Sequence, residues 1–391
     1  MNISNMKKEA CCGCTACKFL CPMSAISMQE DVQGFLYPSV NDELCSECGV
    51  CVDVCKSKTS HSIDAPLKVY AAKSKNVEVQ KKASSGGICA ELSKNCIKAG
   101  GIVYGVVYDD SYNVVTSRID HVEDCDKLYG SKYVQTDLKN TIAEVIKDLK
   151  LGRDVLYFGT SCHISGLLEA IDRKKMNREK LTTVDLICHG VPSPKLFSEY
   201  IRFLKRNIDF VGFSFRTKYL KWGRGSKQYG TTIFYNNRRE TNTLKSNAYL
   251  RLFFSNNCLR PACYRCKHIG LNKVGDFTVA DYWGLKDVHP EFFDEYGVSA
   301  VFINSERAEK LFSQLKNVAY IESSIELVAK KQYNMHKASV KGKMYEMFWQ
   351  DYKNKGFEYV LKKICRFEIF CKSKKNNQKI ARNRNMVKVH A

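Results

Sequence analysis

Residues 11–22 read Cys-Cys-Gly-Cys-Thr-Ala-Cys-Lys-Phe-Leu-Cys-Pro, and this stretch decides the class of the protein. Four of its cysteines follow the spacing C-x2-C-x2-C-x3-C, and Pro22 comes directly after the last. Residues 45–55 repeat the same spacing, with Lys56 where the first run has proline. Such short spacings bring several thiolates to one centre, so the two runs predict two metal sites close to the N-terminus.

The doubled run is typical of bacterial two-cluster ferredoxins, in which the fourth cysteine of each run binds the other cluster. We therefore predict a ferredoxin-like α+β domain over residues 1–60 that holds two 4Fe–4S clusters. The first cluster would be bound by Cys11, Cys14, Cys17 and Cys55. The second would be bound by Cys45, Cys48, Cys51 and Cys21.

Two other uses of these cysteines are less favoured. C-x2-C pairs also build zinc sites, but zinc rarely requires three cysteines at this spacing followed by a fourth, repeated twice. A disulfide scaffold is disfavoured, because the chain has an odd number of cysteines, 19, and residues 1–10 lack the apolar region of an export signal. Cys12 is left over and is interpreted as a bystander beside the loop.

The composition of the 391-residue chain is that of a globular protein, with 44% hydrophobic and 26% charged residues. We expect two or three domains, no transmembrane segment and a cytoplasmic location. The net charge of +21 could indicate binding to nucleic acid. The sequence lacks a recognised reader motif, and anionic cofactors would offset part of this charge, so no nucleic-acid partner is predicted.

The central region alternates strand and helix patterns, which predicts an α/β domain with a mainly parallel sheet. We expect strands at 102–108, 154–158 and 181–187, and a helix at 163–175. The small residues Ser84-Ser85-Gly86-Gly87 open another helix, where free backbone N–H groups could bind a phosphate. The same residues would also suit an ordinary helix cap and turn.

Four more cysteines fall where a third metal site could form. Cys162 and Cys188 follow two successive predicted strands, and carboxyl ends of parallel strands meet at one edge of a sheet. Cys263 and Cys266 form a C-x2-C pair, which is half of a four-thiolate site. The alternative is that each is a small buried thiol. Cys258 is left out of the proposed ligand set.

Several motifs together resemble one known family, the beta subunits of coenzyme F420 hydrogenases and dehydrogenases, in the form with a fused two-cluster ferredoxin. The resemblance covers about residues 8–290. The matching stretches are Gly34-Phe35-Leu36-Tyr37-Pro38, Ser84-Ser85-Gly86-Gly87, Tyr129-Gly130-Ser131-Lys132-Tyr133-Val134-Gln135, Gly159-Thr160-Ser161-Cys162, Cys188-His189-Gly190-Val191-Pro192-Ser193, Leu259-Arg260-Pro261-Ala262-Cys263-Tyr264-Arg265-Cys266 and Asp281-Tyr282-Trp283-Gly284. Ser161 departs from the family, which usually has proline there.

The resemblance implies an FAD site, a third 4Fe–4S cluster beside it, and hydride exchange with a deazaflavin or similar small two-electron carrier. The third cluster would be bound by Cys162, Cys188, Cys263 and Cys266. Residues implied at the FAD are Ser84, Ser85, Gly86, Gly87, Ser131, Lys132 and Tyr133. On this basis residues 67–290 form the FAD and iron–sulfur α/β domain, and 291–350 are its C-terminal extension.

Residues 351–391 carry 12 Lys+Arg against 3 Asp+Glu and are expected to form a basic helix and tail. The tail could be solvated, or dock on an acidic protein or the surface of an anionic membrane. The predicted function is a flavin-containing iron–sulfur oxidoreductase that passes electrons to a partner protein or a larger redox complex. The alternative is an iron–sulfur carrier or docking subunit without flavin.

Overall fold

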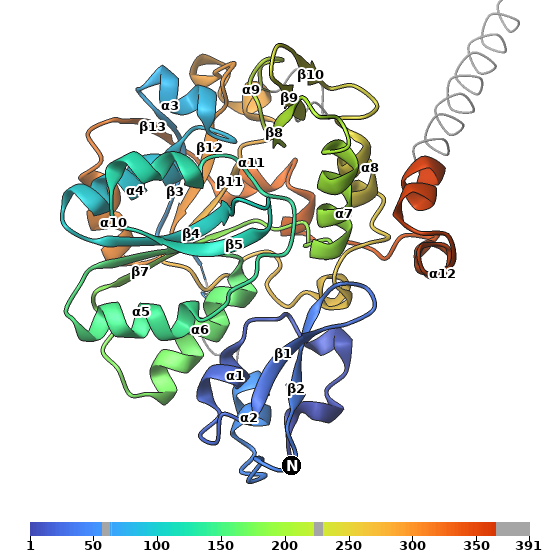
Figure 1. Cartoon of the computed structure of the whole chain (residues 1–391). Coiled ribbons are helices and arrows are strands. Elements are labelled where there is room, and N and C mark those ends of the chain that lie inside the picture. The colour runs from blue at the N-terminus through green and yellow to red at the C-terminus, as the bar shows by residue number, and fades with distance from the viewer. Residues whose placement is uncertain (57–62, 64, 223–229, 365–391) are drawn as a thin grey trace, which may run out of the picture.

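The computed structural model describes residues 1–56, 63, 65–222 and 230–364. A small N-terminal part lies below a larger α/β part that is built on one central sheet (Figure 1). The tail beyond residue 364, with Cys365 and Cys371, lies outside the described residues, as does most of the linker around 57–62.

The N-terminal part consists of two short helices and a hairpin. Helix α1 (Ala16–Leu20) and helix α2 (Val50–Lys56) follow the two cysteine loops and contact each other. Strands β1 (Ile26–Glu30) and β2 (Leu36–Val40) pair antiparallel between them. Each loop turns at a glycine with positive φ, Gly13 or Gly49, a conformation that costs glycine little. This arrangement fits the ferredoxin-like expectation.

The central sheet has eight strands in the order β13-β3-β12-β11-β7-β6-β4-β5. Its four middle strands, β11, β7, β6 and β4, run parallel, as the strand–helix alternation predicted. Antiparallel strands extend the sheet on both sides. The bounds are β3 Lys68–Ser74, β4 Ile102–Tyr108, β5 Val114–Ile119, β6 Val155–Phe158, β7 Leu181–Leu186, β11 Phe277–Asp281, β12 Ser299–Ile303 and β13 Val318–Glu322.

Helices cover both faces of this sheet, because successive side chains of a strand point to opposite sides. On β4, Val103 packs with helices α4 and α10, whereas Tyr104 packs with α5 and α6 on the other face. Figure 1 shows α4 and α10 on one side of the sheet and α5 and α6 on the other, so the middle strands are covered on both faces. The bounds are α3 Val77–Lys82, α4 Ile88–Lys98, α5 Thr141–Lys150, α6 Ser161–Arg173, α9 Leu285–Val288, α10 Glu306–Ser313 and α11 Ile325–Ala329.

Helix α6 begins two residues earlier than the sequence pattern predicted. Thr160 is its extended N-cap, so Ser161 and Cys162 occupy the first helical turn rather than the preceding loop. Apolar periodicity starts only at Ile164, and small residues before it carry no such signal. The thiol of Cys162 is therefore held by a helix end directly after β6.

Residues 291–350, which were expected to extend the α/β domain, supply two strands of its central sheet. Strand β3 pairs with β12 on one side and β13 on the other, so these late strands hold the first strand of the domain in place. Tyr70 of β3 packs on Phe312 of α10, with ring centroids 5.1 Å apart. The segment thus completes the central sheet.

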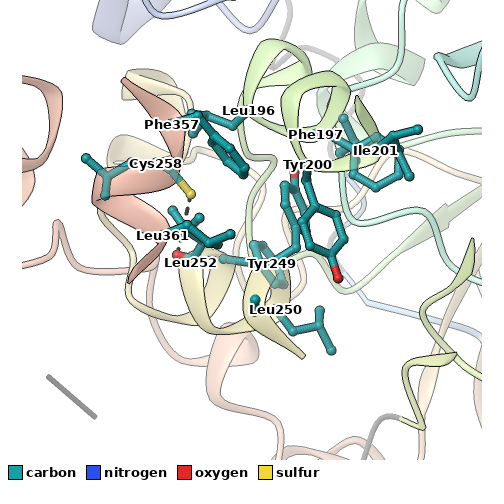
Figure 2. Packing of buried hydrophobic residues seen from close by; sticks show 14 of the residues in the cluster. Leu196, Phe197, Tyr200, Ile201, Tyr249, Leu250, Leu252, Cys258, Phe357 and Leu361 are labelled. Atoms are coloured by element: carbon teal, nitrogen blue, oxygen red, sulfur yellow. Dashed lines mark hydrogen bonds between the residues drawn. The ribbon is translucent and has the colours of Figure 1, made fainter. Parts of the chain in front are cut away.

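A second core lies beside the sheet and involves the end of the described chain. In it, helices α7 (Pro194–Leu204) and α8 (Ala248–Phe254) pack with the small sheet of β8 (Phe210–Ser214), β9 (Thr232–Tyr235) and β10 (Arg239–Thr241). Helix α12 (Tyr345–Lys355) and the helical residues 357–364 close it. Phe357 and Leu361 lie in one cluster with Leu196 and Leu252 (Figure 2).

None of the helices in the described part of the chain combines the length and the hydropathy required to cross a membrane.

Candidate metal centres

The cysteines expected to bind the first ferredoxin cluster surround one hollow. Cys11, Cys14, Cys17 and Cys55 all line the same hollow beneath the first loop. Cys17 comes from α1, and Cys55 reaches the hollow from the far end of α2. Cys11 and Cys14 are buried, so this hollow is largely withdrawn from solvent.

The cysteines expected to bind the second cluster surround another hollow. Cys21, Cys45, Cys48 and Cys51 line it together with Met1 and Asn2. Cys21 is the C-cap of α1, and the backbone N–H of Ala25 donates to its thiol at 3.3 Å. Cys48 is exposed, so this second hollow lies nearer to solvent than the first.

The first cysteine loop lies directly against the α/β domain. Gly166 of α6 contacts Cys14 so closely that a Cβ added to the glycine would lie 2.7 Å from the Cys14 Sγ. Helices α1 and α2 both contact α6 (Figure 1). A centre held by the first loop would therefore be next to the sheet edge, and one held by the second loop farther out.

Cys162, Cys188 and Cys263 all lie near Cys266 at that sheet edge, since repulsion by Cys266 contributes to the raised pKa of each of the other three thiols. Burial raises the pKa of the Cys188 thiol to about 11, with a further contribution from repulsion by Cys266. Burial also raises the pKa of Cys263, and both Cys188 and Cys266 add to that shift. The thiols are thus near enough to interact, although they come from three separate segments.

No three His, Cys, Asp or Glu side chains among the described residues converge closely enough to hold a single metal ion. A four-iron cubane is wider than one ion and separates its four thiolates around a larger space. Cysteines lining a hollow suit that shape better than a tight tetrahedral zinc site does.

Cys12 lies within the third group, which the sequence interpretation as a bystander did not anticipate. Its thiol donates to the carbonyl of Cys162 at 3.8 Å. A hydrogen bond with Cys12 is also the main cause of the raised pKa of Cys162. Cys258, by contrast, lies in the apolar second core, where its thiol donates to the carbonyl of Leu252 at 3.4 Å (Figure 2).

The segments implied at the flavin meet in one polar network beside this group. The hydroxyls of Ser84 and Ser131 are hydrogen-bonded at 2.8 Å, although 47 residues separate them in the chain. Tyr133 accepts a hydrogen bond from Arg216 at 2.9 Å. Lys132 donates to the carbonyls of Lys127 and Tyr129, and burial lowers its pKa to about 7.

Arg216 is the centre of that network and was missed by sequence reasoning. Its guanidinium forms two hydrogen bonds to Asp281, at 2.8 and 3.0 Å, and donates to the carbonyl of Ser84 at 2.6 Å. Burial disfavours ionisation of Asp281, but Arg216 keeps its pKa below the ordinary value. Trp222 donates its indole N–H to Asp281 and stacks on Trp283. Asp281 and Trp283 belong to a stretch that resembles the family. Strand β8 and the residues after it, including Arg216, contain no motif that would have indicated a binding site.

Lys218 adds a second cation on the same side. Its ammonium donates to the carbonyl of Ser84 at 2.8 Å. Burial, with repulsion from Arg216, lowers its pKa to about 7. Both cations follow β8, and Arg216 meets Asp281 at the carboxyl end of β11. Two nearby cations can bind an anionic group such as a phosphate.

The glycines of the Ser84–Gly87 segment are explained by close packing. The N–H of Gly86 donates to Ser299, and a Cβ on this glycine would lie 2.4 Å from the carbonyl oxygen of Ala72. Gly87 has a φ of +87° and lies against Val79 and Ser74. A bulky residue at Gly87 would therefore collide with the protein itself, so contact of this segment with phosphate stays a prediction.

Two cysteine loops lie against a partly parallel α/β sheet, and further thiols lie at the edge of that sheet. This arrangement is typical of iron–sulfur electron-transfer proteins. Residues 10–59 match the family described as 4Fe–4S dicluster domain. Residues 152–326 match the family described as the C terminus of the coenzyme F420 hydrogenase/dehydrogenase beta subunit. The chain is therefore similar to this beta-subunit family over residues 152–326 and to a dicluster domain over residues 10–59.

Comparison with solved structures gives a chain of the xenon-derivatised F420-reducing NiFe hydrogenase complex from Methanosarcina barkeri. It is 17% identical, with a TM-score of 0.47, and the match covers 70% of this chain and 91% of that one. No curated protein matches the sequence. The two family matches support iron–sulfur electron transfer and an oxidoreductase role.

Proposed function

We propose that the protein is a flavin-containing iron–sulfur oxidoreductase. It would exchange a hydride with a small two-electron carrier, either coenzyme F420 or a similar molecule, through FAD. Three 4Fe–4S clusters would then pass electrons singly to a partner protein or larger redox complex. FAD is the group that converts between two-electron and one-electron transfer.

The observation that carries this proposal is the succession of three cysteine groups. The third group lies at the sheet edge, where Cys12 of the first ferredoxin loop contacts Cys162. The first hollow follows, with Cys14 against α6, and the second hollow is outermost, with Cys48 exposed. This order supports a path from the α/β domain through the first cluster to the second, with a partner docking near Cys48.

The proposed FAD site is the network around Arg216, with Ser84, Ser131 and Tyr133 at its border. Arg216 and Lys218 would hold the pyrophosphate, because they supply one buried and one half-buried cationic donor on one side. The network lies at the same sheet edge as the third cysteine group, since Asp281 ends β11 and Cys188 follows its parallel neighbour β7. The chain's own residues would thus orient the flavin, bury it and keep it near the thiolates.

Anaerobic purification followed by iron, sulfide, zinc and flavin analysis of one sample tests the composition. We expect about twelve iron atoms per chain, from three cubanes, and one FAD. Two clusters without flavin would instead support an electron-carrier subunit. A protein with zinc and no iron would contradict the proposal.

Single cysteine substitutions test the two crossed ligand sets. Cys14→Ser should disturb the cluster of the first hollow, and Cys48→Ser that of the second, because each cysteine lines only its own hollow. Cys89→Ala, at a cysteine packed against the core from α4, serves as the control and should retain all the iron. Electron paramagnetic resonance of the reduced proteins distinguishes the clusters. Equal loss of both clusters in each variant would contradict the assignment.

A further inference from the structure

Arg260 is a fully buried cation, with 1% of its surface exposed, at the boundary between the cysteine loop and the α/β domain. Its Nε donates to the carbonyl of Cys11 at 2.7 Å, and Nη2 donates to the Cys11 Sγ at 3.4 Å. The same guanidinium donates to the side-chain oxygen of Gln135 at 2.9 Å and to the carbonyl of Leu36 at 2.9 Å. It also lies over the ring of Tyr37, with 4.2 Å between the guanidinium carbon and the ring centroid.

None of the hydrogen-bond partners of this guanidinium among the described residues is a carboxylate. Its acceptors are two backbone carbonyls, an amide oxygen and a thiol. Removing an ion from water is costly unless an opposite charge compensates it. A cluster bound through Cys11, with a net charge of about −2, would supply that charge beside the guanidinium.

The position of Arg260 in the chain links two cysteine groups. It directly precedes η4 (Pro261–Arg265), the short turn that carries Cys263 of the third group. Gly13 of the first loop makes room for its side chain, because a Cβ there would lie 3.2 Å from Arg260 Nη1. One side chain thus fastens the first ferredoxin loop to the segment that holds the third group.

We propose that Arg260 raises the reduction potential of the cluster bound by Cys11 and positions it as the entry point of electrons into the ferredoxin domain. The proposal rests on the function proposed above. Reduction adds one electron from the donor and changes the charge of the cluster from about −2 to about −3. A fixed buried cation stabilises the more negative state, and a hydrogen bond to a ligand sulfur acts in the same direction. Arg260 is accordingly a positioning residue.

Arg260→Met in the anaerobically purified full chain tests this role, with Arg265→Met as the control. Arg265 lies on the same short turn but is exposed. We expect Arg260→Met to make reduction of one ferredoxin cluster at least tenfold less favourable, which is a fall of about 59 mV for a one-electron couple. The other ferredoxin cluster and the Arg265→Met protein should keep their wild-type potentials. A dithionite titration followed by electron paramagnetic resonance measures both potentials, and Cys48→Ser identifies the second cluster.

Arg260→Lys decides the outcome if Arg260→Met binds less iron. Lysine keeps the charge but lacks the forked donors that reach Cys11 and Leu36 together. The proposal requires a lower potential of the first cluster in this variant too, by a smaller amount. Unchanged potentials in an iron-replete Arg260 variant, or an equal shift of both clusters, would overturn it. Iron-free wild-type protein would instead contradict the proposed function.

Discussion

At the scale of single residues, the cations around Ser84 set the chemistry of the candidate flavin site. Arg216 is held in its charged form by the adjacent Asp281 carboxylate. Lys218 forms no such ion pair with the described residues and lies beside Arg216, so burial and like-charge repulsion lower its pKa to about 7. Its protonation state therefore depends on what binds next to it.

We predict that FAD affinity falls as the pH rises above neutrality, because of Lys218. Bound phosphate would favour the ammonium form, so binding above the lowered pKa of about 7 takes up a proton. The dissociation constant should then increase up to about tenfold per pH unit above pH ~7. Lys218→Met should bind FAD more weakly and lose this pH dependence. Titration of flavin-depleted protein with FAD, followed by fluorescence, measures it.

Lys221→Met is the matched control for that experiment. Lys221 is exposed and pairs on the surface with Glu295 at 2.6 Å. The Lys221→Met protein should keep the FAD affinity of the wild type and the same dependence of the dissociation constant on pH. If the dissociation constant of Lys218→Met depended on pH as in the wild type, the Lys218 ammonium would not bind the phosphate.

At the scale of secondary-structure elements, the contact of α6 with the cysteine loop depends on one glycine. Alanine in a helix is normally more favourable than glycine by about 1 kcal/mol. At Gly166, however, the added methyl group would lie 2.7 Å from both Cβ and Sγ of Cys14. Overpacking of a core costs about 1–3 kcal/mol, so the clash outweighs the gain in helix propensity.

We therefore predict that Gly166→Ala lowers the free energy of unfolding by up to about 2 kcal/mol, the overpacking cost less the propensity gain. It should also slow electron transfer from the α/β domain to the first cluster. Chemical denaturation and stopped-flow reduction measure the two effects. Lys147→Ala, at an exposed position of α5, should change neither. A Gly166→Ala protein more stable than the wild type would contradict this contact.

The C-terminal helical residues 357–364 belong to the second core, although they lie within the basic segment 351–391. Leu361 is 5% exposed and packs in the cluster with Leu252 and Phe357 (Figure 2). We predict that Leu361→Ala lowers the free energy of unfolding by about 2–5 kcal/mol, the usual cost of such a buried truncation. Lys362→Ala, which removes an exposed pair with Glu358, should cost less than about 0.5 kcal/mol. Equal effects of the two substitutions in denaturant unfolding would contradict the packing.

At the scale of the whole molecule, the third cysteine group joins three segments of the α/β domain. Cys162 follows β6, Cys188 follows β7, and Cys263 and Cys266 precede β11. We predict that removing iron with a chelator lowers the unfolding temperature, because ligation binds these segments together in the folded state only. Calorimetry before and after cluster reconstitution measures the change. Cys263→Ser should show a smaller loss on chelation, and an unaffected wild type would contradict the prediction.

The outer elements of the sheet show what local sequence could not reveal. The strand–helix alternation indicated the parallel strands β4, β6 and β7, because a helix directly precedes β4 and directly follows β6 and β7. Nothing local connects β3 with β12 and β13, which pair with it across more than 220 residues. Likewise, Arg216 lies in a strand without a chemical motif, and only folding places it against Asp281 and Ser84.

The sequence by itself determined the two ferredoxin loops, since cysteine spacing alone constrains which thiolates can reach a common centre. It also determined the strands that precede Cys162 and Cys188, through their apolar residues, and the Cys263–Cys266 pair, through its C-x2-C spacing. Only the tertiary structure decided that the first loop faces the α/β domain, that Cys12 meets Cys162, and that Arg260 bonds to Cys11. These contacts join residues 150 to 249 positions apart, and they form because helix α6 and the turn before β11 meet the cysteine loop at one sheet edge.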